Sequence, residues 1–225
     1  MSTSIKRILA CALGLALSTP AIATAKTASM HSAAYRKAAH STEANELRVP
    51  MRKLWQDHVL WTRLVIVSMA AGLPDATPTT ERLLRNQNEI GNAVKPYYGA
   101  TAGNKLTALL RTHIQQAAAV ISAAKANNTA RLETAKRDWF ANADQIADFL
   151  SAANPHNWPR SQMRQMMRDH LNLTLAEATD QLQGHYGQSV ADYDRVEDEI
   201  LKMADALSDG IAKQFPNKVR LVAMQ

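Results

Sequence analysis

Residues 51–69, MRKLWQDHVLWTRLVIVSM, have the pattern that most constrains the fold of this chain. Successive residues of a helix are about 100° apart, and at that spacing one stripe collects the apolar side chains while Arg52, Lys53, Gln56 and Arg63 point away. His58 lies at the centre of the apolar stripe. The stretch therefore predicts an amphipathic helix that carries a histidine into a hydrophobic core.

The same pattern returns in residues 163–174, MRQMMRDHLNLT, where His170 takes the place of His58. A second echo links residues 84–98 to residues 201–215. Each echo pairs two segments of helical periodicity. The sequence therefore predicts a pseudo-repeat of two helical hairpins, in which His58 and His170 occupy equivalent positions.

The rest of the chain also reads as helices separated by turns rich in Gly, Pro and Asn. Pro50 is expected to open the first helix, and Thr77 and Ser161 are expected to cap the second and fifth. No alternating or valine-rich run suggests a strand. The predicted fold class is all-α, an up-down bundle of five or six helices. The expected helices cover residues 51–71, 78–98, 102–126, 130–153, 161–183 and 189–214.

The N-terminus has the features of a secretory signal peptide. Lys6 and Arg7 precede an apolar run over residues 8–17, and small residues suited to cleavage follow at Ala23 and Ala25. The predicted domain organisation is a signal peptide (1–25), a flexible tail (26–49), the helical bundle (50–216) and a C-terminal tail (217–225). The chain is therefore expected to be exported to the periplasm or secreted as a soluble protein, with no membrane span in its mature form.

Cysteine content and charge exclude several classes of function. Cys11, the one cysteine, lies in the signal peptide, so the mature chain has no thiol ligand or nucleophile. Without Lys6 and Arg7 the basic residues fall from 26 to 24 against 20 acidic residues, so the net charge falls from +6 to +4. The basic residues form no cluster with aromatic residues, so nucleic acid is not an expected partner. A small ligand or another protein is the expected partner.

Three predicted helices each carry one histidine in the middle of the apolar stripe, and these are His58, His113 and His170. A fourth helix contributes Asn142 at the corresponding level. Neutral imidazole binds zinc or copper, and three converging histidines would suffice for a catalytic-type zinc site. The first hypothesis is therefore an exported bundle that binds a metal ion or a small ligand through its core histidines. Thioether ligands for copper(I) would come from Met51, Met69, Met163, Met166, Met167 and Met203.

Two alternatives stay open. In the first, the protein is purely structural or interacts with a partner, and the histidines form a buried polar layer bonded to groups such as Thr62, Gln87 and Thr174. In the second, the protein is a metal-dependent enzyme. Glu177 and Glu197 fall within inward stripes and would allow a carboxylate–histidine acid/base pair. An end-of-helix position that reaches solvent is the plainer interpretation of both glutamates.

The motifs LWQDHVLWTRL, LLRNQNEIGNAVKPYYG and HNWP resemble those of a group of small exported bacterial proteins without an established function. The resemblance covers roughly residues 50–216 and implies an exported helical bundle. Members of the group are variously named as glycosyltransferases and acetylglutamate kinases. This sequence has neither the strands nor the glycine-rich phosphate loop that those activities require.

Overall fold

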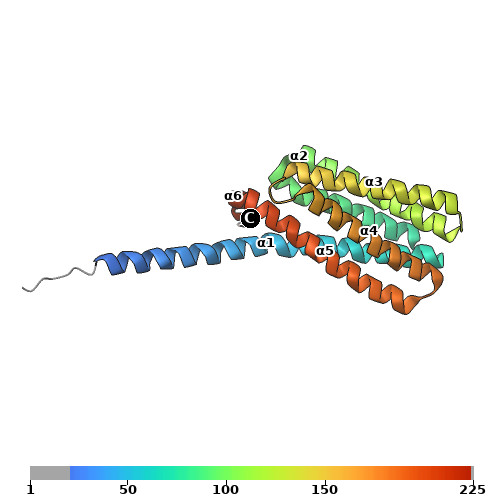
Figure 1. The fold of residues 1–225 in the computed structure, drawn as a ribbon, viewed down its shortest axis with the longest axis horizontal. Coiled ribbons are helices and arrows are strands. Elements are labelled where there is room, and N and C mark those ends of the chain that lie inside the picture. Colours follow the sequence, from blue (N-terminus) through green and yellow to red (C-terminus); the bar gives the residue numbers. More distant parts are fainter. Residues whose placement is uncertain (1–20, 224–225) are drawn as a thin grey trace, which may run out of the picture. The chain divides into compact units, whose positions relative to one another are not determined.

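The computed structural model describes the backbone of residues 21–223 and the side chains of residues 46–219. The chain divides into two units, residues 1–40 and residues 41–225. Residues 1–20 of the predicted signal peptide lie outside the described residues, so export stays a prediction. Six helices follow one another, and no strand occurs between residues 21 and 223, so the all-α prediction is confirmed (Figure 1). They are α1 (Ala21–Ala71), α2 (Ala76–Lys125), α3 (Thr129–Ala153), α4 (Arg160–Gln183), α5 (Tyr186–Gln214) and α6 (Pro216–Ala223).

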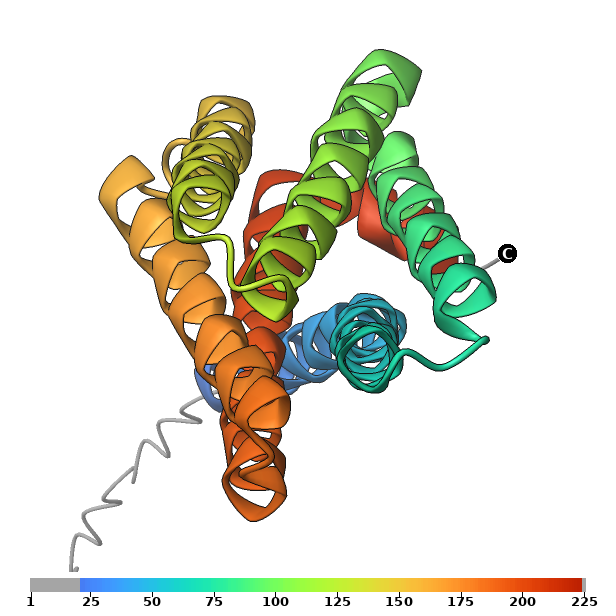
Figure 2. The same cartoon turned by 90° about the vertical axis from the view of Figure 1, so that its right-hand side faces the viewer.

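Helix α2 folds back on itself and forms two legs of the bundle (Figure 2). Gly99 interrupts it with φ 84° and ψ 167°, a conformation that a residue with a side chain rarely adopts. The two legs approach closely at Gly91 and Gly103, where a Cβ on Gly103 would lie 2.6 Å from the Gly91 carbonyl oxygen. The two predicted helices over residues 78–98 and 102–126 are therefore both present, joined by a sharp kink.

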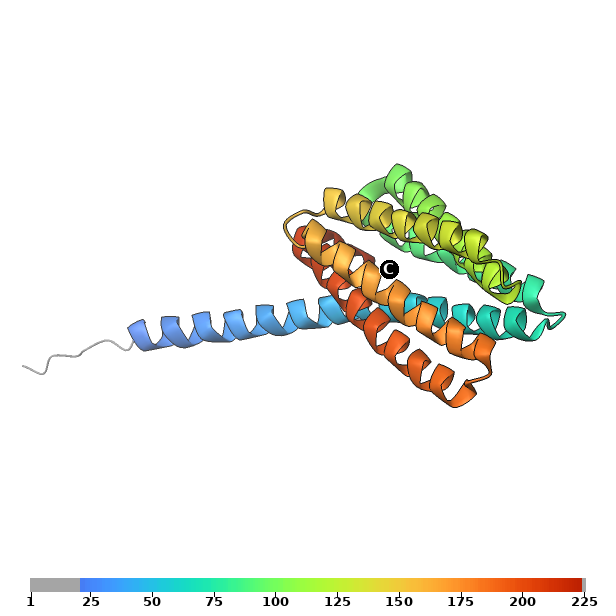
Figure 3. The ribbon, with the colours of Figure 1, turned by 45° about the vertical axis from the view of Figure 1, so that its right-hand side comes forward.

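Neighbouring helices run antiparallel and are tied together by ion pairs. Figure 3 shows α4 and α5 side by side, joined at Gly184, which has a left-handed φ of 78° and ends α4. Arg52 of α1 donates two hydrogen bonds to Asp205 of α5, at 2.7 and 2.5 Å. Arg164 of α4 makes the same bidentate contact with Asp148 of α3, at 2.8 and 2.7 Å. These pairs lie at the surface and each adds little stability, but they fix which helix faces which.

Several predicted boundaries are wrong. Pro50 does not open a helix but lies inside α1, because Leu47 and Met51 are both buried and hold the chain helical around the missing proline N–H. Within the predicted C-terminal region, Pro216–Ala223 form α6, which buries Val219 in the core. Neither Thr77 nor Ser161 caps a helix, because Asp75 and Pro159 take those N-cap positions without a side-chain bond.

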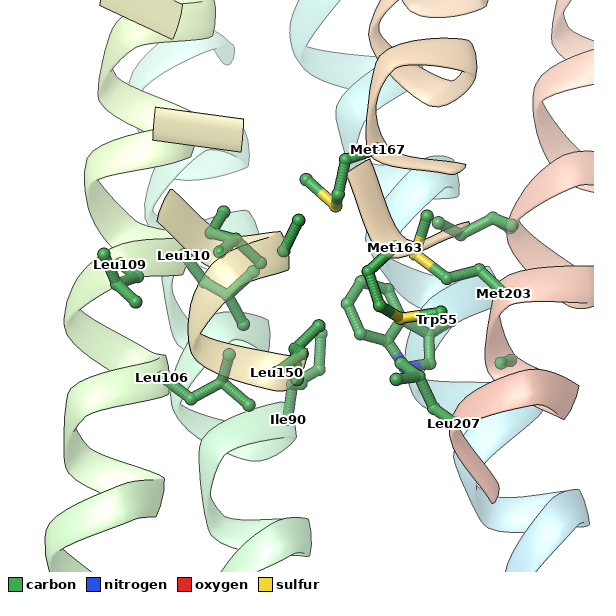
Figure 4. Close-up of a cluster of buried hydrophobic side chains, with 14 of the residues drawn as sticks. Trp55, Ile90, Leu106, Leu109, Leu110, Leu150, Met163, Met167, Met203 and Leu207 are labelled. Carbon is green, nitrogen blue, oxygen red and sulfur yellow. The ribbon is translucent and has the colours of Figure 1, made fainter. Parts of the chain in front are cut away.

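The core runs along the bundle between the helices. Figure 4 shows Met163 and Met203 beside Trp55, and Ile90 with Leu150 on the other side of the interior. All five are buried, with exposures between 1 and 7%. The methionines lie among apolar side chains, which is the role of core filler that their helical spacing also allowed. None of the helices within residues 21–223 is apolar enough over its length to cross a membrane.

The pseudo-repeat of the two hairpins stays a prediction. One local feature agrees with it. Thr62 donates to the carbonyl of His58 at 2.7 Å, and Thr174 donates to the carbonyl of His170 at 2.9 Å. The two histidine-bearing turns therefore share the same side-chain to backbone bond, four residues after each histidine.

Candidate functional site

The three predicted histidines are buried and lie close together. His58, His113 and His170 come from α1, the second leg of α2 and α4, and their exposures are 2, 2 and 3%. The ring centroid of His170 lies 5.7 Å from that of His58 and 6.5 Å from that of His113. The helical periodicity therefore placed all three correctly in the interior. We call these three residues the histidine layer.

His113 has a partner on each ring nitrogen. Its Nδ1 lies 3.1 Å from Asn142 Oδ1, and its Nε2 accepts a hydrogen bond from Trp139 Nε1 at 3.2 Å. The Asn142 amide is itself oriented, because its Nδ2 donates to the Leu109 carbonyl at 3.3 Å. This network assigns the proton of His113 to Nδ1 and commits the Nε2 lone pair to the indole. His113 keeps no lone pair for a metal ion.

His58 is also committed. Gln87 Nε2 donates to the Leu83 carbonyl at 2.8 Å and faces His58 Nδ1 at 3.3 Å, while the Gln87 side chain is fully buried. Gln87 Nε2 also lies 3.1 Å from Asn86 Oδ1, so its two hydrogens serve three acceptors. In the tautomer in which His58 Nδ1 accepts from this amide, the neutral ring carries its proton on Nε2. Neither nitrogen of His58 is then a ready metal ligand.

His170 differs from both. Its Nδ1 lies 3.3 Å from Oε2 of Glu199 on α5. Both atoms are buried and neither has a hydrogen-bond partner among the described residues. Glu199 was not predicted as a site residue. It could have been found by counting from the Gly184 turn, because residues at similar distances before and after a tight turn face each other in an antiparallel hairpin.

Burial holds His58 and His113 in their neutral forms. Desolvation lowers the pKa of His58 well below its ordinary value of 6.5, and a positive charge on His170 or His113 would lower it further. Desolvation, again with His170, lowers the pKa of His113 to about 3. His58 and His113 are therefore neutral hydrogen-bonding groups at ordinary pH.

A buried ion pair lies near the layer, between Glu177 of α4 and Arg63 of α1, with Oε1 and Nη1 2.8 Å apart. Burial raises the pKa of Glu177 to about 7, against the opposing charge and hydrogen bond of Arg63. Arg63 also donates to the Ser189 carbonyl at 3.1 Å. The expectation that Arg63 points away from the core is wrong, and so is the expectation that Glu177 reaches solvent, because this pair closes the α1–α4–α5 junction.

The other candidate carboxylate, Glu197, pairs with a glutamine and not with a histidine of the layer. It accepts a hydrogen bond from Gln56 Nε2 at 2.5 Å on the exposed side of α1 and α5. Neither predicted glutamate pairs with a histidine of the layer, and the carboxylate that lies 3.3 Å from His170 Nδ1 belongs to Glu199, two residues after Glu197.

A small cavity lies beside the layer. A cavity of about 20 Å³ lies one helical turn from the histidines, lined by Thr62, Ala117, Trp139 and Thr174 among others. Such a volume holds one water molecule at most. Larger hollows of about 370 and 480 Å³ have none of the three histidines in their walls.

A metal site built from all three histidines is not supported. In the part of the chain with described side chains, no group of three or more His, Cys, Asp or Glu residues is placed to hold a metal ion. The physical reason is visible at His58 and His113, whose lone pairs face amide and indole donors. Two further histidines, His31 and His40, lie in the predicted tail, outside the residues with described side chains.

Comparison with known proteins adds no identification. No family model matches the chain, and neither a curated protein nor a solved structure does. The resemblance to exported bacterial helical-bundle proteins, through LWQDHVLWTRL, LLRNQNEIGNAVKPYYG and HNWP, stays a prediction.

Proposed function

We propose that this protein is an exported, non-catalytic helical bundle of the structural or interaction type, in which the histidine layer sets the register of the helices. The observation that carries the proposal is the double engagement of His113 by Asn142 and Trp139. A buried polar group with two fitting partners strongly disfavours any packing that separates them. The layer therefore links α2 to α3 in one alignment.

The same reasoning extends to α1. The Gln87 amide faces His58 Nδ1, and the neighbouring Asn86 donates to the Leu54 carbonyl of α1 at 3.0 Å. A slip of one residue along either helix would turn these groups away from each other, since neighbouring positions are about 100° apart. Apolar contacts alone tolerate such slips more readily, so the polar contacts supply specificity.

Export is supported by the sequence features of the N-terminus. A basic start, an apolar run over residues 8–17 and small residues at Ala23 and Ala25 are typical of a cleaved signal. Intact-mass measurement on protein from the host should find a mature chain that begins at Thr24 or Lys26. A cytosolic product that retains Met1 would contradict export and leave the role of the layer untouched.

The role of the layer is tested by a double-mutant cycle on metal-free protein. His113→Ala, Asn142→Ala and the double variant are unfolded with urea after treatment with a chelator. The proposal expects a cooperative transition in the chelated wild type and a coupling of about 1 to 2 kcal/mol between the two residues. Additive effects, or a wild type that loses its cooperative transition without metal, would overturn it. His113→Gln, which retains an amide donor and acceptor, should be partly tolerated.

A further inference from the structure

His170 and Glu199 present two uncommitted ligand atoms to each other. Nδ1 of His170 and Oε2 of Glu199 are 3.3 Å apart, and their side chains are 4 and 14% exposed. Their separation is within hydrogen-bonding range, yet neither atom forms a hydrogen bond with any described residue. The two atoms therefore converge without satisfying each other.

Glu199 also lies apart from the lysine and arginine side chains of residues 46–219. Among residues 46–219, His170 is the basic side chain that comes within ion-pair distance of it. A carboxylate that is mostly removed from water requires a positive charge or a proton beside it. By contrast, the buried carboxylate of Glu177 has the guanidinium of Arg63 at 2.8 Å.

The spacing of the two atoms fits a shared metal ion. A zinc ion bound to an imidazole nitrogen and a carboxylate oxygen, each at about 2.0 to 2.2 Å, places those two atoms about 2.9 to 3.4 Å apart for angles near 90 to 110°. The observed 3.3 Å lies in that range. A bound ion would engage both unpartnered atoms and neutralise the carboxylate. The exposed edge of Glu199 gives an ion a route from solvent.

We propose that His170 and Glu199 bind one late divalent transition-metal ion, of the zinc or copper class, with water completing the coordination. A nitrogen and a carboxylate oxygen are the ligand types that these ions accept. The site takes one residue of the histidine layer and leaves His58 and His113 to their hydrogen bonds. It goes beyond the proposed function, because the register role of the layer does not require the ion.

Binding is measured by titrating Zn²⁺ and Cu²⁺ separately into the untagged full chain near neutral pH, with calorimetry and metal analysis after dialysis. The expected result is one tight equivalent per chain. Glu199→Gln preserves the shape of the side chain and should weaken binding at least about tenfold, as should His170→Gln. Glu197→Gln is the matched control, since it removes a carboxylate from the same helix only two residues away, and it should leave binding unchanged.

The copper-loaded protein provides a second readout. Electron paramagnetic resonance should show coupling to one imidazole nitrogen in the wild type and lose it in His170→Gln. Glu199→Gln keeps the test decisive if His170→Gln fails to fold, because Glu199 lies at the edge of the core. Equal binding by the wild type and Glu199→Gln would show that Glu199 is not a ligand and overturn the proposal. An absence of binding would also overturn it and would leave the register role of the layer unaffected.

Discussion

His113 and His170 occupy equivalent places in the apolar stripes of their helices, yet their surroundings differ. His113 meets an amide oxygen and an indole N–H, both from α3, and both of its nitrogens are satisfied. His170 meets a carboxylate on α5 across 3.3 Å without a hydrogen bond. Position in a stripe therefore decides that a histidine is buried. The residues on the facing helix decide whether it is a structural group or an available ligand.

The largest expected effect comes from truncating the two histidines. His113→Ala leaves a cavity and strands both Asn142 and Trp139, so the free energy of unfolding should fall by about 4 kcal/mol. His170→Ala leaves a cavity but breaks no side-chain hydrogen bond, so the loss should be about 2 kcal/mol. Urea unfolding of the metal-free variants measures both. An equal loss for the two would erase the distinction between them.

The second expected effect is on the pH dependence of stability. Below pH 6.5 the unfolded chain protonates His58 and His113 while the folded chain does not, so each histidine removes about 1.4 kcal/mol per pH unit as the pH falls. Glu177 acts in the opposite direction between pH 7 and pH 4.5, because its raised pKa of about 7 lets the folded chain hold the extra proton. Stability should therefore fall by a net amount of about 1.4 kcal/mol per unit between pH 6.5 and 4.5.

The variant Glu177→Gln separates these contributions. Without the opposing carboxyl, the fall between pH 6.5 and 4.5 should steepen to about 2.7 kcal/mol per unit. Thermal or urea unfolding across this pH range measures the slope. A slope that is unchanged in Glu177→Gln would show that this carboxyl is not protonated in the folded protein, and a flat profile in the wild type would contradict the neutral state of His58 and His113.

The smallest expected effect isolates one hydrogen bond on the His113 side. Trp139→Phe removes the indole N–H that His113 Nε2 accepts, at a cost of about 1 kcal/mol beyond the change in packing. Trp55→Phe is the matched control, because Trp55 is equally buried and its indole nitrogen has no partner among the described residues. The difference between the two variants in urea unfolding reports the bond. Equal free energies of unfolding for the two variants would mean that the Trp139 indole forms no stabilising hydrogen bond with the His113 ring.

Much of the fold followed from periodicity in the sequence. The apolar stripes of residues 51–69 and 163–174 correctly predicted that His58 and His170 are buried. The predicted helix ends at residues 98 and 183 are correct, and Gly99 and Gly184 lie at those breaks. These features are local, since they depend on the 3.6-residue repeat of a helix and on the left-handed conformations that glycine adopts readily. The same local rules misplaced Pro50, because packing of Leu47 and Met51 outweighs the lost hydrogen bond.

The partners of the buried polar groups were decided by tertiary structure. The sequence placed His170, Glu177 and Arg63 on their helices. It did not indicate that Arg63 turns inward to Glu177 or that Glu199 faces His170. Those contacts depend on the rotation and axial offset of one helix against another, which the turns and the whole core set together. An imidazole can also donate or accept at either nitrogen, and only the neighbours fix which. The sequence by itself therefore determined that the bundle buries three histidines. The packing of the helices determined that two are committed to hydrogen bonds and that His170 faces a carboxylate.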